Sequence, residues 1–298
     1  QSNMNVNEVI ANRGNEIARE QLLHPNDDVN KGQSSNDTFP TAMHIAAIEA
    51  LRKQLMPQLE EMIHALKRLE KENQHIIKIG RTHLQDATPL RFSQEISGWR
   101  GMLENNIDML QKAIDSLRKL AIGGTAVGTG LNTPQGFGDL VCERLSDQLA
   151  TQFISDPNKF HALSAKDDIC FAHGALKALA ANCMKMANDV RWLASGPRCG
   201  LQEIRIPENE PGSSIMPGKI NPVMPEMVMQ TAMRVCANDT AITMAAGRGE
   251  FELNEFGPLM AETMLESLEL MSDTVRILWE KAVCNLPANK ENCLNALE

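Results

Sequence analysis

Apolar residues recur at intervals of three and four over five long stretches of the chain. This spacing limits the folds that the chain can adopt. The stretches cover residues 48–69, 92–117, 176–193, 224–242 and 260–278. Such spacing places the apolar side chains on one face of an amphipathic helix. Helices of roughly 25–30 residues would each be about 40 Å long at 1.5 Å per residue. We therefore predict an all-α fold, a bundle of five long helices, and helices of this length favour packing in an oligomer.

The composition excludes several classes of protein. The 298 residues are 43% hydrophobic, without a run of about 18 apolar residues and without a signal-peptide pattern. The net charge of −9 argues against nucleic acid as the main partner, so an anionic ligand would need a local cationic pocket. Seven scattered cysteines without a CxxC pair fit reduced thiols. We expect a cytoplasmic protein that binds neither nucleic acid nor a membrane; because the chain starts at Gln1, a mitochondrial matrix location stays open.

Four polar segments that contain Gly or Pro connect the predicted helices. They cover residues 24–36, 80–89, 123–136 and 196–222. Loops on a rigid scaffold commonly carry binding and catalytic residues. The last segment is long for a connection between bundled helices, where about 2–8 residues are common, so we expect it to be functional or disordered.

The first of these segments has a structural interpretation as well as a chemical one. His24, Asp27 and Asp28 are candidate metal ligands, but no further His or Cys lies at ligand spacing, so a turn or helix cap is favoured and no metal is expected. The run Ser34–Asp37 is typical of a helix N-cap when it is taken alone.

The other segments contain no pattern that decides the chemistry by itself. His83 alone is more typical of a hydrogen-bonded structural histidine than of a catalyst. The glycine-rich residues 123–130 lack the GxxxxGK[ST] pattern of a phosphate loop and favour a tight turn. Ser213 lies outside a GxSxG motif, so a serine hydrolase is not favoured.

The sequence GSSIMPGKIN at residues 212–221 matches a long and specific signature, roughly GSSxMPxKxN. Further matching blocks are QSNMNVNEV, HPNDDVNKGQSSND, GRTHLQDATPL, GGTAVGTGLNTP and RWLASGPRCG. On these motifs, which cover almost the whole chain, the sequence resembles the fumarase/aspartase superfamily. Within it the chain looks like the class II fumarases, the iron-independent type, because GRTHLQDA has His83 where aspartases usually have Gln. NPVMPEMV and ANKENC are closer to aspartases, so aspartate ammonia-lyase stays as the alternative.

The resemblance implies a role for each matching residue. Ser213 matches the catalytic base, His83 the group that handles the water, and Glu226 the carboxylate that orients this histidine. The positions that match substrate-binding residues are Ser34, Ser35, Asn36, Thr82, Ser214, Lys219, Ile220 and Asn221. The positions that match a second, weaker dicarboxylate site near the entrance are His24, Pro25, Asn26 and Asp27.

The implied reaction is the reversible anti hydration of fumarate to (S)-malate in the citric acid cycle, without a cofactor. Removing the C3 proton of malate puts charge onto the adjacent carboxylate as an aci-carboxylate. The site therefore needs a base, donors for the developing oxyanion, an acid for the leaving hydroxide and anchors for two carboxylates. A free serine hydroxyl is too weak a base and must be activated by cationic and amide donors, for which Lys219 and Asn221 are candidates. A polar arm that closes on the substrate would bring this base with it.

The resemblance also implies an assembly and a division of the chain. The family forms homotetramers whose bundles merge into one helical core, and each active site takes loops from three chains. Residues 1–36 match the remnant of a small N-terminal domain, 37–288 the central bundle, and 289–298 the start of a C-terminal small domain that is missing or truncated. A non-catalytic helical structural protein, like the crystallins descended from this superfamily, is the alternative from another class.

Overall fold

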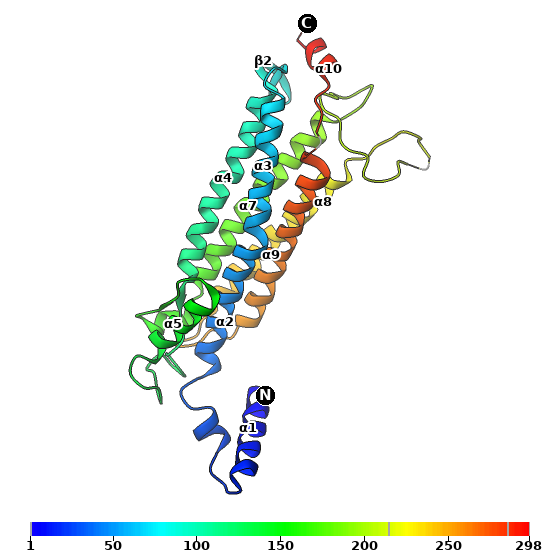
Figure 1. The fold of residues 1–298 in the computed structure, drawn as a ribbon. Coiled ribbons are helices and arrows are strands. Elements are labelled where there is room, and N and C mark those ends of the chain that lie inside the picture. Colours follow the sequence, from blue (N-terminus) through cyan, green and yellow to red (C-terminus); the bar gives the residue numbers. More distant parts are fainter. Residues whose placement is uncertain (1, 214, 285, 298) are drawn as a thin grey trace. The chain divides into compact units, whose positions relative to one another are not determined.

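The structure is a computed structural model that describes residues 2–213, 215–284 and 286–297. Its described residues form five long helical runs, so the prediction of an all-α bundle is confirmed (Figure 1). The runs are α2 (Ser35–Ala50), which continues through the π-helical turn η2 (Leu51–Leu55) into α3 (Met56–Glu72), then α4 (Phe92–Leu117), α7 (Asp167–Leu193), α8 (Val223–Ala246) and α9 (Gly257–Leu278). The shorter elements are α1 (Ser2–Ala18), η1 (Pro25–Val29), β1 (Ile77–Thr82), β2 (Gln85–Arg91), β3 (Lys119–Leu120), α5 (Phe137–Leu149), β4 (Ile154–Ser155), α6 (Lys159–Ser164), η3 (Trp279–Val283) and α10 (Lys290–Asn295).

The chain divides into two compact units. The first comprises Gln1–Ala46, Ser116–Ile169 and Thr243–Ala261, and the second comprises Ala47–Asp115, Cys170–Ile242 and Glu262–Glu298. All five long helical runs contribute residues to both units. The polar segments 24–36 and 123–136 belong to the first unit, whereas 80–89 and 196–222 belong to the second. None of the described helices is both long enough and apolar enough to cross a membrane.

The apolar stripes read from the sequence form the core of the second unit. Leu59 and Leu66 of α3, Leu103 of α4 and Leu179 of α7 are fully buried. Within this unit α3, α4, α7, α8 and α9 run side by side (Figure 1). Burying each such side chain contributes about 1.5–3 kcal/mol. The spacing of three and four therefore specifies the helices and also the faces that they bury.

A β-hairpin replaces one predicted loop, so the interpretation of residues 80–89 as a loop is wrong. Strand β1 pairs antiparallel with β2, and Thr82 is opposite Gln85. The two residues of the turn, His83 and Leu84, have φ angles of 55° and 60°. Two-residue hairpin turns of this kind usually use Asn-Gly or Asp-Gly. A His-Leu turn therefore carries no recognisable hairpin signal in the sequence.

In the first unit, buried Asp37 ties the start of α2 to the glycine-rich segment. Its Oδ1 accepts a hydrogen bond from the Ser34 backbone N–H at 3.0 Å. Its Oδ2 accepts from the backbone N–H groups of Gly123 at 3.0 Å and Thr125 at 2.9 Å. The segment that follows Gly123 consists of turns, as predicted, and it wraps this carboxylate instead of presenting its amides to a ligand.

Candidate active site

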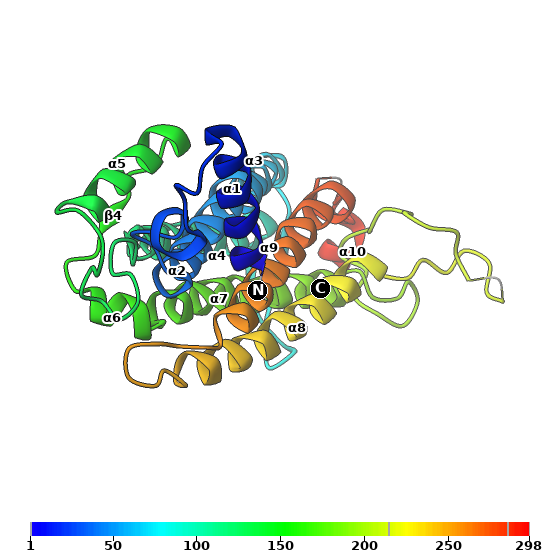
Figure 2. The same ribbon diagram turned by 90° about the horizontal axis from the view of Figure 1, so that it is seen from below.

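Residues 207–222, which we call the arm, connect the segment after α7 to the start of α8. In both ribbon views the described part of the arm stands away from the helices of the second unit (Figures 1 and 2, yellow-green). Asn209 Nδ2 donates to the Lys281 carbonyl oxygen at 2.8 Å and ties the start of the arm to η3. The signature residues 212–221 lie beyond this tie. A segment with few buried contacts opens at low free-energy cost, so the arm is suited to move over a ligand.

The hydroxyl of Ser213 is turned into its own loop. Its Oγ accepts hydrogen bonds from the backbone N–H groups of Ile215 at 3.3 Å and Met216 at 3.2 Å. The loop is closed by Lys219 N–H, which donates to the Met216 carbonyl oxygen at 3.2 Å. Two amide donors on one oxygen form a small anion-binding nest. Such a nest lowers the free-energy cost of ionising the Ser213 hydroxyl, which a serine base requires.

A cavity of about 620 Å³ lies beside the arm and brings several predicted site residues together. Lys219, Ile220 and Asn221 line it from the arm, and Glu226 lines it from the first turn of α8. The opposite wall comes from the segment that follows α7 and from Arg191 in the last turn of that helix. Ser213 is outside the lining of this cavity. Lys219 and Asn221 supply the cationic and amide donors that a carboxylate ligand needs.

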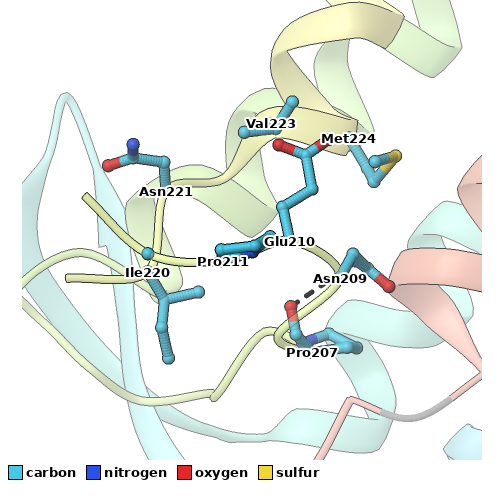
Figure 3. A pocket seen from close by; sticks show the side chains of 9 residues that line it. Pro207, Asn209, Glu210, Pro211, Ile220, Asn221, Val223 and Met224 are labelled. Atoms are coloured by element: carbon cyan, nitrogen blue, oxygen red, sulfur yellow. Dashed lines mark hydrogen bonds between the residues drawn. The ribbon is translucent and has the colours of Figure 1, made fainter. Parts of the chain in front are cut away.

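A second, much smaller cavity separates the base of the arm from the start of α8 (Figure 3). It has a volume of about 40 Å³, which is room for a few water molecules and not for a dicarboxylate. The side chain of Glu210 reaches from the arm toward Val223 and Met224 (Figure 3). A carboxylate beside a helix N-terminus is stabilised by the helix dipole. The Glu210 carboxylate therefore lies where the dipole of α8 favours a negative charge.

Thr82 and His83 are exposed at the tip of the β-hairpin. Behind them, Arg81 Nη2 donates to Oε1 of Glu203 at 2.8 Å, and Lys78 Nζ lies 3.1 Å from Oε2 of the same carboxylate. Lys78 and Glu203 are almost completely buried. These ion pairs hold the hairpin against the segment that leads to the arm. The imidazole of His83 has no hydrogen-bond partner among the described residues, so it is available to a ligand or to another chain.

Ser34, Ser35 and Asn36 open helix α2 in the first unit. Ser34 Oγ accepts from the Asn36 backbone N–H at 3.1 Å, and the Ser34 backbone N–H donates to Asp37 Oδ1, so the predicted N-cap is confirmed. Asn36 Nδ2 donates to the Ala126 carbonyl oxygen at 2.7 Å. Ser35 and Asn36 also line a cavity of about 240 Å³ with Phe39.

The turn that contains His24, Pro25, Asn26 and Asp27 is capped by the histidine itself. His24 Nδ1 accepts from the backbone N–H groups of Asn26 and Asp27, both at 3.3 Å. The interpretation of this stretch as a helix cap is confirmed, because the side chain closes the π-helical turn η1. The Asp27 side chain remains exposed.

Residues 1–237 match the model of a protein family described as a lyase. The chain belongs to this lyase family. A relative from Bacillus subtilis (strain 168) named fumarate hydratase class II is 55% identical over 295 residues, which are 98% of this chain and 64% of the relative. A relative of the same name from Campylobacter jejuni subsp. jejuni serotype O:2 is 57% identical over 280 residues, 92% of this chain and 60% of its own length. The crystal structure of recombinant class II fumarase from Schistosoma mansoni superposes with a TM-score of 0.92 at 39% identity, over 100% of this chain and 66% of that one. The chain thus spans about two thirds of the length of these lyases.

The described part of this chain brings only some predicted site residues into one place. Lys219, Ile220, Asn221 and Glu226 share a cavity, whereas Ser213, Thr82 and His83 are outside its lining. Ser214 lies outside the described residues. Sequence reasoning missed the three arginines of the opposite wall, Arg191, Arg198 and Arg205, although three cationic residues within fifteen positions of an acidic chain are a usable signal. No group of three or more His, Cys, Asp or Glu side chains among the described residues has the geometry to hold a metal ion.

Proposed function

We propose that this lyase catalyses the reversible hydration of fumarate to (S)-malate. The observation that carries the proposal is the signature-bearing arm beside a cationic cavity, in a chain 55% identical to a protein named fumarate hydratase class II. The cavity is lined by four cationic side chains and one carboxylate, in a chain whose net charge is −9. A dianionic substrate would be attracted to this place. A cytoplasmic location is part of the proposal, and the two relatives named above come from bacteria.

In the proposed reaction Ser213 removes the C3 proton of malate. The backbone amides of Ile215 and Met216 already point at its oxygen and would stabilise the alkoxide. Lys219 and Asn221 would hold the carboxylate onto which charge develops, because a cation and an amide donor both bind the doubly charged aci-carboxylate more strongly than the singly charged carboxylate of the ground state. Closing of the arm would bring base and anchors to the substrate together.

His83 is proposed to protonate the hydroxide that leaves C2 of malate. Its place at the tip of a hairpin anchored by buried ion pairs gives the imidazole a defined position and leaves it exposed. Glu226 would orient this imidazole and raise its basicity. We propose further substrate contacts at Thr82, Ser34, Ser35, Asn36 and Ser214. The turn His24–Asp27 is proposed as a second, weaker dicarboxylate site.

We further propose a homotetramer in which three chains contribute to each active site. The arm and the hairpin tip belong to the second unit, but the cavity of the arm is not lined by Thr82 or His83. A symmetric oligomer supplies those side chains from neighbouring copies without a change in the fold of the chain. Its helical faces would merge into a common core.

The proposal is tested by following the ultraviolet absorbance of fumarate with the intact protein. We expect fumarate to be consumed without added ammonia and malate to be converted to fumarate. Aspartate should give no appreciable fumarate. Faster turnover of aspartate than of malate would assign the chain to the aspartate ammonia-lyases, and no turnover of any of the three would favour a non-catalytic helical protein.

A further inference from the structure

The wall of the cavity that faces the arm carries a surplus of positive charge. Arg191, Arg198 and Arg205 line it together with Lys219, and Glu226 is the only carboxylate among its described lining residues. The surplus is three charges, four cations less one carboxylate. Charges of one sign that line a concave surface focus their field into it and concentrate ligands of the opposite sign.

The guanidinium of Arg191 has only weak partners among the described residues. Its Nη2 lies 4.0 Å from Glu226 Oε1, and its Nη1 donates to the thioether sulfur of Met229 at 3.2 Å. A thioether is a weak acceptor. Its Nε is buried and has no hydrogen-bond partner among the described residues. A guanidinium with five donors and one distant carboxylate retains the capacity to bind a second anion in bidentate geometry.

The arginine wall is fixed to the body of the second unit, unlike the arm. Ser195 Oγ accepts from the Leu201 backbone N–H at 3.1 Å, which closes the loop that bears Arg198. Arg205 N–H donates to the Pro287 carbonyl oxygen at 3.0 Å. Arg191 itself belongs to helix α7. Movement of the arm would therefore carry Lys219 and Asn221 with it and leave these three arginines in place.

We infer that Arg191 is a substrate-binding residue that takes one carboxylate of a dicarboxylate and selects against ligands that carry an ammonium group. Arg198 and Arg205 add to the field at the rim of the cavity. The selection follows from charge: fumarate and malate bring two negative charges, whereas aspartate also brings a positive group into a cavity with a surplus of three positive charges. The inference rests on the proposed function, since it names how that site chooses its substrate class.

The test compares the binding of two non-reacting or slowly reacting probes, succinate and L-aspartate, by titration calorimetry on the full-length protein. The variants are Arg191→Gln and Arg191→Lys. The matched control is Arg276→Gln, because Arg276 also lies in the last turn of a long helix, pairs with Asp273 at 3.1 Å, and is outside the cavity. Thermal unfolding of each variant shows whether the role of Arg191 is only to stabilise the C-terminus of helix α7 by its positive charge.

We expect Arg191→Gln to weaken succinate binding by about tenfold or more and to change aspartate binding much less. The succinate affinity of Arg191→Lys should lie between those of the wild type and Arg191→Gln, since lysine keeps the charge but not the planar guanidinium group. Arg276→Gln should bind both probes as the wild type does. Unchanged succinate affinity in a folded Arg191→Gln protein would overturn the inference, as would a fall in melting temperature without a change in the ratio of the two affinities. Failure of the wild type to hydrate fumarate would refute the proposed function separately, because the binding ratio is measured without turnover.

Discussion

The guanidinium of Arg81 donates a hydrogen bond of 2.8 Å to the carboxylate of Glu203, which lies 122 positions further along the chain. The same carboxylate lies 3.1 Å from Lys78 Nζ, and Lys78 also pairs with Glu95 at 2.7 Å. Arg81 is next to Thr82 at the hairpin tip, and Glu203 is ten positions before Ser213. One buried ionic cluster therefore joins the segment that bears the proposed acid to the segment that leads to the proposed base.

This cluster makes Glu203 a sensitive position for stability. Glu203→Ala would leave two cations without their buried partner, and breaking a buried ion pair costs about 3–5 kcal/mol. Glu16→Ala on α1 is the control, because Glu16 pairs with Arg13 at 2.8 Å while both side chains are exposed, and such pairs contribute about 0–1 kcal/mol. Urea unfolding of the two variants measures the difference. Equal losses would show that the cluster does not anchor the hairpin.

The fold was largely predictable because periodic burial is a local property of the sequence. Leu59, Met62 and Leu66 follow the spacing of three and four and are fully buried. The hairpin was not predictable, because the conformation of His83 and Leu84 is imposed by pairing of β1 with β2 and by the ion pairs of Arg81, which depend on distant residues. The signature marked Lys219 and Asn221, but no local pattern shows that Arg191 shares a cavity with them.

The acid–base assignments predict different losses for three substitutions. Ser213→Ala should lose nearly all activity and still bind a dicarboxylate inhibitor, since Lys219 and Asn221 remain. His83→Asn should lower kcat by about 10²–10⁴, the usual contribution of a positioned acid or base. Glu226→Gln should have a smaller effect because it acts through the histidine. Initial rates with malate and inhibitor titrations measure these losses, and wild-type turnover by Ser213→Ala would remove that serine from the mechanism.

Stability should fall as the pH falls below about 6.5, because of a buried histidine of α7. His173 is fully buried, with Nδ1 at 3.0 Å from Asp239 Oδ1 and Nε2 at 2.9 Å from Ser267 Oγ. Burial lowers the pKa of His173 below its ordinary value of 6.5, although the hydrogen bond with Asp239 acts in the other direction. Above pH 6.5 the histidine is neutral in both states and has no effect. Below pH 6.5 the histidine binds a proton in the unfolded chain at a higher pH than in the folded protein. The free energy of unfolding therefore falls by up to about 1.4 kcal/mol per pH unit for this histidine.

The measurement is the free energy of unfolding of His173→Gln and of the wild type between pH 5 and 8. We expect a smaller slope below pH 6.5 in the variant, because glutamine does not titrate. His64→Gln serves as the control, since His64 lies on an exposed face of α3. Parallel pH curves for His173→Gln and the wild type would show that this histidine does not contribute to the acid sensitivity.

The assembly proposal predicts that two inactive proteins restore activity when they are combined. Ser213→Ala and His83→Asn are purified separately, unfolded, mixed in equal amounts and refolded, so that subunits assort at random. If the base and the acid of one site come from different chains, each is intact with a probability of one half. About one site in four then contains both, and activity should rise toward that fraction of the wild type in a closed symmetric oligomer. If both residues came from one chain, every site would keep one lesion. Refolded mixed tetramers, identified by native mass spectrometry, that stay as inactive as their parents would therefore exclude active sites shared between chains.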